Sequence, residues 1–255
     1  MWRHGSDILY SASDAANAHE CGSQIPSNGS IISIFPPEAG KWRSRKVVTR
    51  SKARPTGKYP SWKMGRMIQW ESINELNAYR LLDANPSVSG YHEQPFTIQY
   101  QLNGEVRLHY PDTLVLFGAT KELWEIKPAS DVVKPDVAER TALLTGALPN
   151  HGFAYRLVIA EELGREPRLT NVLALLKFGR NPISSVDREH LRMVLLQEGW
   201  ITWGALASGA IGAKGRHVVC RLVLEGVLTF DLDVPWTNDT VLSWKSRKVI
   251  TSGGY

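Results

Sequence analysis

Two charged side chains within a segment that otherwise has the pattern of a buried strand constrain this chain most. In KELWEIKP (residues 121–128), the two-residue period of a strand puts Glu125 and Lys127 on the same face. Burying charged groups is costly unless they pair with each other or bind a metal ion. Asp112 opens the neighbouring apolar run TLVLF, so it supplies a further carboxylate from the adjacent predicted strand.

These groups match the needs of metal-dependent phosphodiester hydrolysis. Mg²⁺ prefers oxygen ligands, commonly one or two carboxylates together with water and substrate phosphate. We expect the carboxylates of Asp112 and Glu125 and the backbone carbonyl of Ile126 to hold the ion, for which Mn²⁺ would substitute. Lys127 would hold the attacking water, help to deprotonate it and offset charge on the phosphorus. Glu75, on the preceding predicted helix, would complete the metal shell and position a second ion.

Other interpretations of these residues stay open. The alternative is a purely structural Asp112–Lys127 ion pair, with Glu125 at a sheet edge. His109 could act as a general base, but a packed or hydrogen-bonded histidine is favoured because the set described above requires no base. The turn at residues 93–95 (EQP) is expected to be structural, with a DNA contact by its glutamine as the alternative.

Periodicity predicts an α/β fold. The segment WESINELNAYRLLDANPSV has helical spacing and ends at Asn85-Pro86. Asn103-Gly104 between FTIQYQL and EVRLHY is a strong hairpin signal. TLVLF and KELWEIKP then read as strands, followed by a helix over about residues 132–148, the strand YRLVIAEEL and the helix TNVLALLKFG. The order predicts a mixed α/β sheet core flanked by helices.

The pattern after Asn181-Pro182 is mostly helical. Two short helices, a longer one and a two-stranded ribbon are the order of a winged helix-turn-helix. Basic residues lie near the start of its candidate recognition helix, and they would enter the major groove if the unit reads DNA. Alternatively, the unit serves to dock a protein partner, and both interpretations stay open. The basic residues are Lys214, Arg216, His217 and Arg221.

We therefore divide the chain into a disordered leader (1–40), a basic arm (41–66), an endonuclease domain (67–182) and a winged-helix C-terminal domain (183–255). The arm carries ten Lys/Arg and no Asp/Glu, so it is expected to bind DNA phosphates with release of counterions, a solvated linker being the alternative. The expected DNA-binding residues are Arg43, Arg45, Lys46, Arg50, Lys52, Arg54, Lys58, Lys63 and Arg66.

Bulk composition is compatible with a nucleic-acid partner and argues against a disulfide-stapled, zinc-binding, membrane-spanning or secreted protein. The formal charge of +5 suits a polyanion but does not prove one. The two cysteines, Cys21 and Cys220, lack metal-ligand spacing, which makes a disulfide framework or a zinc site unexpected and fits a reducing cytosol. No apolar run is long enough for a membrane span, and the first twenty residues lack a signal-peptide core.

From about Ser61 to Tyr255 the sequence resembles the TnsA-like endonuclease subunits of heteromeric cut-and-paste transposons, which belong to the PD-(D/E)xK restriction-endonuclease-like superfamily. The similarity is best in SWKMGRMIQWESINELNAYRLLDANPSVSGYHEQPFTI, HYPDTLVLF, ELWEIKP and FAYRLVIAEEL. The resemblance places the helix glutamate of the family on Glu75 rather than Glu71, because the distance to the EQP turn agrees.

The same resemblance places the metal-binding aspartate of the family on Asp112 and its catalytic lysine on Lys127. Some members carry glutamine at the position of Glu125, whose carboxylate gives this chain the fuller ligand set.

The resemblance also implies a role. The protein would cut the 5′ (non-transferred) strands of double-stranded DNA at transposon ends, while a TnsB-like DDE transposase cuts and joins the 3′ ends and a TnsC-like ATPase selects targets. It would act in the bacterial cytoplasm, associated with the nucleoid when assembled. A stand-alone restriction or repair nuclease and a non-catalytic DNA-binding assembly factor are the alternatives.

Overall fold

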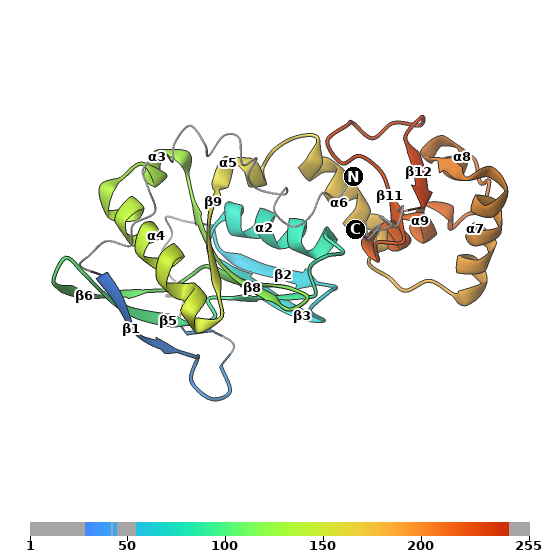
Figure 1. The fold of residues 1–255 in the computed structure, drawn as a ribbon. Helices are drawn as coiled ribbons and strands as arrows, with labels where there is room; N and C mark the ends of the chain where they lie inside the picture. The colour runs from blue at the N-terminus through green and yellow to red at the C-terminus, as the bar shows by residue number, and fades with distance from the viewer. Residues whose placement is uncertain (1–28, 42, 45–54, 245–255) are drawn as a thin grey trace, which may run out of the picture. The chain divides into compact units, whose positions relative to one another are not determined.

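The computed structural model describes residues 29–41, 43–44 and 55–244, and packing divides the chain into two units after Leu169 (Figure 1). Most of helix α6 (Arg168–Gly179) therefore groups with the C-terminal unit, ahead of the boundary expected at Asn181-Pro182. Residues 1–28 of the expected leader lie outside the described residues. No helix in the described part of the chain is both long and apolar enough to cross a membrane.

A four-stranded mixed sheet forms the centre of the N-terminal unit. Its strand order is β4-β7-β8-β9, antiparallel except for the parallel pair β8–β9. A parallel pair needs a crossover, which helices α3 and α4 and the 3₁₀ helix η1 provide. The strands are β4 (Gly90–Glu93), β7 (Thr113–Phe117), β8 (Thr120–Lys127) and β9 (Ala154–Ile159), and the helices are α3 (Ala129–Val132), α4 (Pro135–Ala147) and η1 (Leu148–His151). This confirms the expected mixed α/β class.

A second sheet, in the order β1-β5-β6, packs beside the first. Its strands are β1 (Gly29–Phe35), β5 (Thr97–Leu102) and β6 (Glu105–His109). The predicted hairpin is confirmed: β5 and β6 pair through a turn in which Asn103 and Gly104 have φ of 53° and 82°, as a type I′ turn requires. The disorder expected for residues 29–40 was wrong for β1, which pairs with β5 and packs Ile31 and Ile34 against the core.

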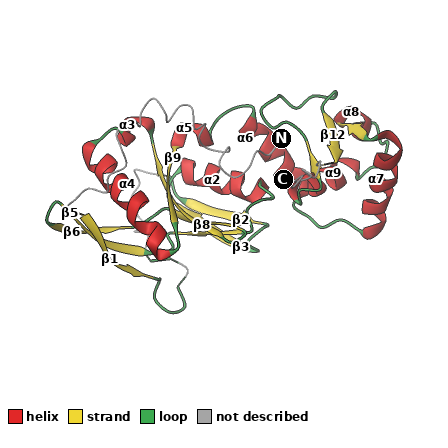
Figure 2. Ribbon diagram, in the orientation of Figure 1, coloured by secondary structure: helices red, strands yellow, loops and turns green. Residues whose placement is uncertain are grey.

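Helices cover the sheets of the N-terminal unit (Figures 1 and 2). Leu144 of α4 and Leu148 of η1 pack against Leu123 of β8 and Ile98 of β5. Helix α2 (Ile73–Ala84) begins at the N-cap Ser72. It contacts strands β2 (Gly57–Ser61) and β3 (Arg66–Trp70) and helix α5 (Ala160–Leu163). Its residues Leu76, Tyr79 and Leu82 are buried, as their spacing predicts.

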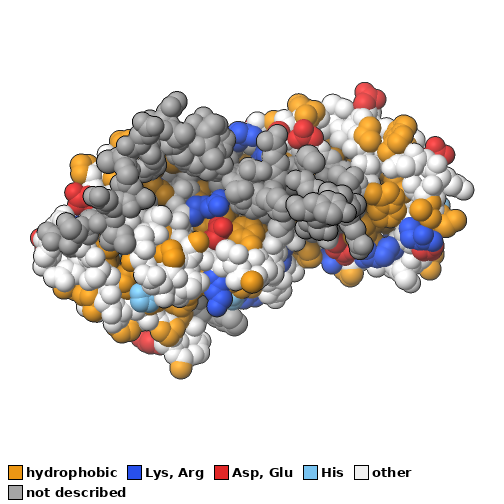
Figure 3. Space-filling model, viewed as in Figure 1, with side chains coloured by type: hydrophobic (Ala, Val, Ile, Leu, Met, Phe, Trp, Pro, Cys, Tyr) orange, Lys and Arg blue, Asp and Glu red, His pale blue; other side chains and the backbone are white. Residues whose placement is uncertain are grey.

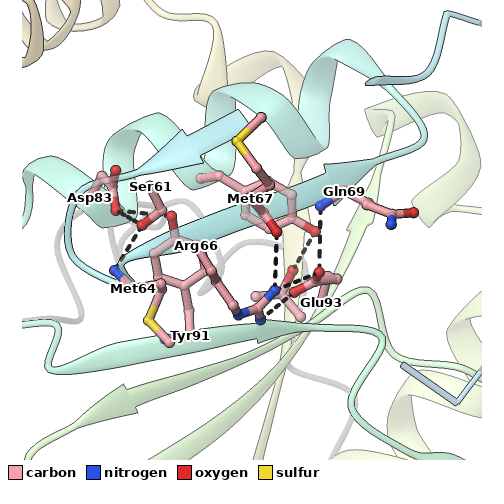
Figure 4. A network of polar contacts seen from close by, with 10 residues as sticks. Ser61, Met64, Arg66, Met67, Gln69, Asp83, Tyr91 and Glu93 are labelled. Atoms are coloured by element: carbon pink, nitrogen blue, oxygen red, sulfur yellow. Dashed lines mark hydrogen bonds and ion pairs between the residues drawn. The ribbon is translucent and has the colours of Figure 1, made fainter. Parts of the chain in front are cut away.

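The end of the expected basic arm is part of the fold (Figure 4). Strands β2 (Gly57–Ser61) and β3 (Arg66–Trp70) form a hairpin, and the Lys63 ammonium between them donates to the carbonyls of Leu82, Asn85 and Val88 at 2.5–3.0 Å. Arg66 forms a two-pronged ion pair with buried Glu93 at 2.7 and 2.9 Å. Lys63 and Arg66 thus stabilise α2 and β4, and their assignment as DNA contacts stays a prediction. The same contacts confirm the structural role expected for the EQP turn.

A buried carboxylate completes this network. Asp83 of α2 is fully buried and accepts hydrogen bonds from the hydroxyls of Tyr59, Ser61 and Tyr91 at 2.6–2.9 Å. These three donors come from β2 and β4, so one carboxylate joins the helix to both strands. Buried charges are tolerated where hydrogen bonds satisfy them in this way.

Replacing Glu93 by alanine would leave the guanidinium of Arg66, which is 17% exposed, without its carboxylate. We expect the free energy of unfolding to fall by about 3–5 kcal/mol, as is typical when one partner of a buried pair is removed. Urea denaturation followed by tryptophan fluorescence measures this. Glu105→Ala removes the carboxylate of an exposed pair with Arg107 and should leave stability nearly unchanged. Equal stabilities for the two variants would contradict this account.

The C-terminal unit contains four helices and a three-stranded antiparallel sheet in the order β10-β12-β11, among the residues that the structure describes. Besides α6, its elements are α7 (Ser185–Glu198), β10 (Trp200–Thr202), α8 (Trp203–Ala207), α9 (Gly215–Leu224), β11 (Leu228–Thr229) and β12 (Val241–Trp244). The helices precede a two-stranded ribbon, as expected, and the short strand β10 adds to it. The winged-helix assignment of this unit stays a prediction.

Gly179 brings the end of α6 onto the backbone of α9. A Cβ at this position would lie 2.8 Å from the carbonyl carbon of Cys220 and 2.9 Å from the amide of Arg221. Gly179→Ala should therefore lower the free energy of unfolding of the C-terminal unit by roughly 1–3 kcal/mol. Thermal and urea unfolding measure the effect, and Lys177→Ala, at an exposed position of the same helix, is the control. Unchanged stability in Gly179→Ala would show that the two helices separate readily.

Candidate active site

The register of β7 against β8 places the predicted acidic residues opposite each other. Thr113 pairs with Trp124, so Asp112, one residue earlier, faces Glu125. The Asp112 carboxylate accepts a hydrogen bond from the Ile126 amide at 2.7 Å. The backbone carbonyl of Asp112 accepts a hydrogen bond from the amide of Gln94 at 2.8 Å, which connects the EQP turn to the site.

Glu125 lies among three basic side chains. It is only 3% exposed, and β8 lies between β7 and β9 rather than at an edge of the sheet. Its Oε1 is 2.7 Å from Lys127 Nζ and 3.7 Å from Arg140 Nη2. The Oε2 atom is 3.5 Å from His109 Nε2 and has no hydrogen-bond partner among the described residues. The alternative of an Asp112–Lys127 pair with Glu125 at an edge is therefore wrong.

The carboxylates at the site act on one another electrostatically. Burial raises the pKa of Asp112 well above its usual range, and the nearby Glu125 and Glu75 carboxylates raise it further. Although burial lowers the pKa of Lys127, the carboxylates of Glu125 and Asp112 outweigh this and raise it. Lys127 is thus held as a cation next to carboxylates that repel one another, an arrangement that a bound cation would stabilise.

Glu75 is held at the start of α2 in a capping box. Its carboxylate accepts hydrogen bonds from the Glu71 amide at 2.9 Å and the Ser72 hydroxyl at 3.2 Å, and the same hydroxyl accepts from the Glu75 amide. Burial raises the pKa of Glu75, and the Glu71 and Glu125 carboxylates add to the rise. The capping hydrogen bonds occupy both carboxylate oxygens of Glu75. Its negative charge nevertheless acts on Asp112, whose pKa it raises.

Asp112, Glu125 and the carbonyl of Ile126 could hold one divalent cation. In the part of the chain that the structure describes, no group of three or more His, Cys, Asp and Glu side chains lies close enough to hold a metal. The expected set needs only two carboxylates, because a backbone carbonyl, water and substrate phosphate supply the remaining ligands of Mg²⁺. The buried Glu125 Oε2 without a hydrogen-bond partner fits this use. A bound ion would polarise the phosphate and activate water.

Two residues of the site were not singled out from the sequence. Arg140 of α4 approaches Glu125, and the Tyr155 hydroxyl of β9 lies 3.3 Å from His109 Nε2. The sequence did hold a signal for Arg140, because helical spacing places it on the same inward face as Val137, three residues earlier, and Leu144, four residues later, both of which are buried. Tyr155 had none, since an aromatic residue in an apolar strand usually belongs to the core.

His109 is buried and contacts Tyr155, as the favoured interpretation expected. Burial lowers its pKa to about 4, and Glu125 opposes the shift. Below pH 6.5 the unfolded chain gains a proton that the folded protein does not bind. From pH 6.5 down to 4, this group should therefore cost roughly 1.4 kcal/mol of stability per pH unit.

A comparison with His109→Gln tests this pH dependence. Urea denaturation at steps from pH 7 to 4 should show wild-type stability falling more steeply than that of the variant in this window. A constant difference between the two proteins would mean that His109 titrates alike in the folded and unfolded states.

Most of the other residues expected to contact DNA lie outside the part of the chain that the structure describes. Arg45, Lys46, Arg50, Lys52 and Arg54 lie outside the described residues. Lys58 is exposed on β2, and Arg43 is half-buried. On the visible face of Figure 3, outside the grey atoms, Lys and Arg side chains form several small groups rather than one continuous patch.

The basic residues of α9 are mostly engaged within the C-terminal unit. The two ring nitrogens of His217 lie 2.6 and 3.3 Å from the carbonyl oxygens of Phe178 and Pro182. Arg221 donates to the carbonyl of Arg180 at 3.0 Å. The Arg216 guanidinium lies 4.9 Å from the ring centre of Trp203, and Lys214 is exposed. These contacts disfavour the reading of DNA bases by His217, Arg221 and Arg216.

Acidic residues and a lysine on paired strands of a mixed α/β unit are consistent with an α/β nuclease core. A family model described as TnsA-like endonuclease N terminal matches residues 85–159. The matched segment ends with β9 and contains Asp112, Glu125 and Lys127, whereas Glu75 precedes it. The match confirms the resemblance to TnsA-like endonucleases and indicates a nuclease that acts in transposition. A search of curated proteins finds no match.

Proposed function

We propose that this protein is a Mg²⁺-dependent DNA endonuclease that cleaves the 5′ (non-transferred) strands at transposon ends. The observation that carries the proposal is the placement of Asp112 opposite Glu125, with Lys127 2.7 Å from Glu125, inside the segment matched by the family model. Mn²⁺ would replace Mg²⁺, because both accept carboxylate and carbonyl oxygens.

Each residue has a distinct task in this reaction. Asp112, Glu125 and the carbonyl of Ile126 would hold the ion, and the amide of Ile126 fixes the orientation of the Asp112 carboxylate. The Lys127 ammonium is partly exposed, with 30% of its side chain accessible, so it can reach an incoming water and the phosphate. Lys127 then holds that water and balances negative charge that develops on the phosphorus. Glu75 contributes negative charge, and it would bind a second ion only if its carboxylate left the capping hydrogen bonds.

The proposed protein works with partners. A TnsB-like DDE transposase would cut and join the 3′ ends, and a TnsC-like ATPase would select the target. Since the α9 side chains are engaged within their own unit, we assign the C-terminal unit to partner docking. Contact with the DNA backbone falls to exposed residues such as Lys58 and to the arm residues beyond the described part of the chain.

Asp112→Asn and Lys127→Ala should each reduce 5′-strand cleavage at least about a hundredfold, because each removes a group that acts on the reacting phosphate or its metal. The assay uses duplexes carrying a transposon end, labelled on each strand, with Mg²⁺ or Mn²⁺ and with and without the partner transposase. Asp136→Asn and Lys134→Ala, at exposed positions on or next to α4, are the matched controls.

Wild-type cleavage rates in Asp112→Asn and Lys127→Ala would overturn the site. Cleavage of a defined duplex by the isolated protein would identify a stand-alone nuclease instead. Tight DNA binding without any cleavage, with or without partners, would identify an assembly factor.

A further inference from the structure

We infer that Arg140 binds a non-bridging oxygen of the scissile phosphate and is a further catalytic residue of this site. The inference rests on the proposed function and extends it to a residue outside the acidic set. Arg140 lies within the segment that the family model matches.

Arg140 occupies a position where the helix otherwise buries apolar side chains. Along α4, Val137, Leu144 and, in η1, Leu148 face the sheet with Arg140 between them. The Arg140 side chain is only 17% exposed. An arginine is rarely placed on a buried face unless its guanidinium has an anion to bind.

The nearest anion in the protein does not satisfy this guanidinium. Glu125 Oε1 is 3.7 Å from Arg140 Nη2, beyond hydrogen-bond distance, and already receives Lys127 Nζ at 2.7 Å. The Arg140 Nε is buried and has no hydrogen-bond partner among the described residues. A group that is charged, enclosed and incompletely hydrogen-bonded at a catalytic carboxylate has donors left for a ligand.

Charge balance points to a phosphate as that ligand. A divalent ion held by Asp112 and Glu125 would neutralise both carboxylates, and Lys127 and Arg140 would then leave positive charge in excess. A phosphodiester brings one negative charge, which grows in the transition state. The forked guanidinium matches phosphate oxygens better than it matches a single carboxylate oxygen.

Lys127 and Arg140 reach the same carboxylate oxygen from different elements. Lys127 extends from strand β8 and Arg140 from helix α4, so a phosphate at the metal would have one cation from each element. This division leaves Lys127 to hold the attacking water and Arg140 to hold the phosphate. The Tyr155 hydroxyl, on the neighbouring strand β9, also interacts with Arg140.

The test measures how Arg140 couples to the charge of one phosphate. A duplex that the wild-type protein cleaves is compared with the same duplex carrying a neutral methylphosphonate at the scissile position. Binding is measured in Ca²⁺ by fluorescence anisotropy, with the partner transposase where cleavage requires it. Arg140→Ala should weaken binding of the natural duplex roughly 10–100-fold and leave binding of the methylphosphonate duplex at the wild-type level.

Two further variants separate this role from a structural one. Arg140→Lys keeps the charge and should recover part of the binding and of the cleavage rate, which in Arg140→Ala falls at least about a hundredfold. Arg156→Ala removes another partly buried arginine, which pairs with Glu122 at 3.2 Å on the other face of β8, and should bind both duplexes as wild type does.

Equal losses of binding on both duplexes in Arg140→Ala would overturn the inference and assign Arg140 a structural role. Cleavage by Arg140→Ala at the wild-type rate would also overturn it, while leaving the nuclease proposal intact. If the wild-type protein cleaves no duplex, or if Asp112→Asn cleaves as well as wild type, the proposed function itself fails and the inference with it.

Discussion

The pairing of β7 with β8 is the constraint on which the site depends. Its register sets Asp112 opposite Glu125, and one hydrogen bond from the Ile126 amide fixes the Asp112 carboxylate. Two carboxylates held together by a sheet cannot move apart to relieve their repulsion. The backbone thus imposes an electrostatic cost at this place, and that cost is what a divalent cation would relieve.

The surrounding network holds this pairing in place. Arg66 fixes Glu93 at the end of β4, and the next residue, Gln94, donates its amide to the Asp112 carbonyl. Gln94 has a φ of 43°, a conformation that costs free energy and brings the chain close to the site. Arg66, which a charge count assigns to DNA, therefore helps to position the residues of the candidate metal site.

The sequence allowed the centre of the site to be predicted because its signals are local. A two-residue period placed Glu125 and Lys127 on one face, and the adjacent apolar run brought in Asp112. Strand β1 could not be predicted, since it exists through pairing with β5, more than sixty residues later, while its flanking composition indicated disorder. The partner of Arg66, Glu93, lies 27 residues further along the chain, and a run of positive charge does not reveal which of its members are buried.

The central claim is that Asp112 and Glu125 form a cation site, and calorimetric titration with Mn²⁺ tests it most directly. The wild-type protein should bind the ion and, because burial raises the pKa of Asp112, release protons as it does so. Heats measured in buffers of different ionisation enthalpy reveal that release. Asp112→Asn and Glu125→Gln should each lose the binding. Identical titrations for the wild type and both variants would contradict the account.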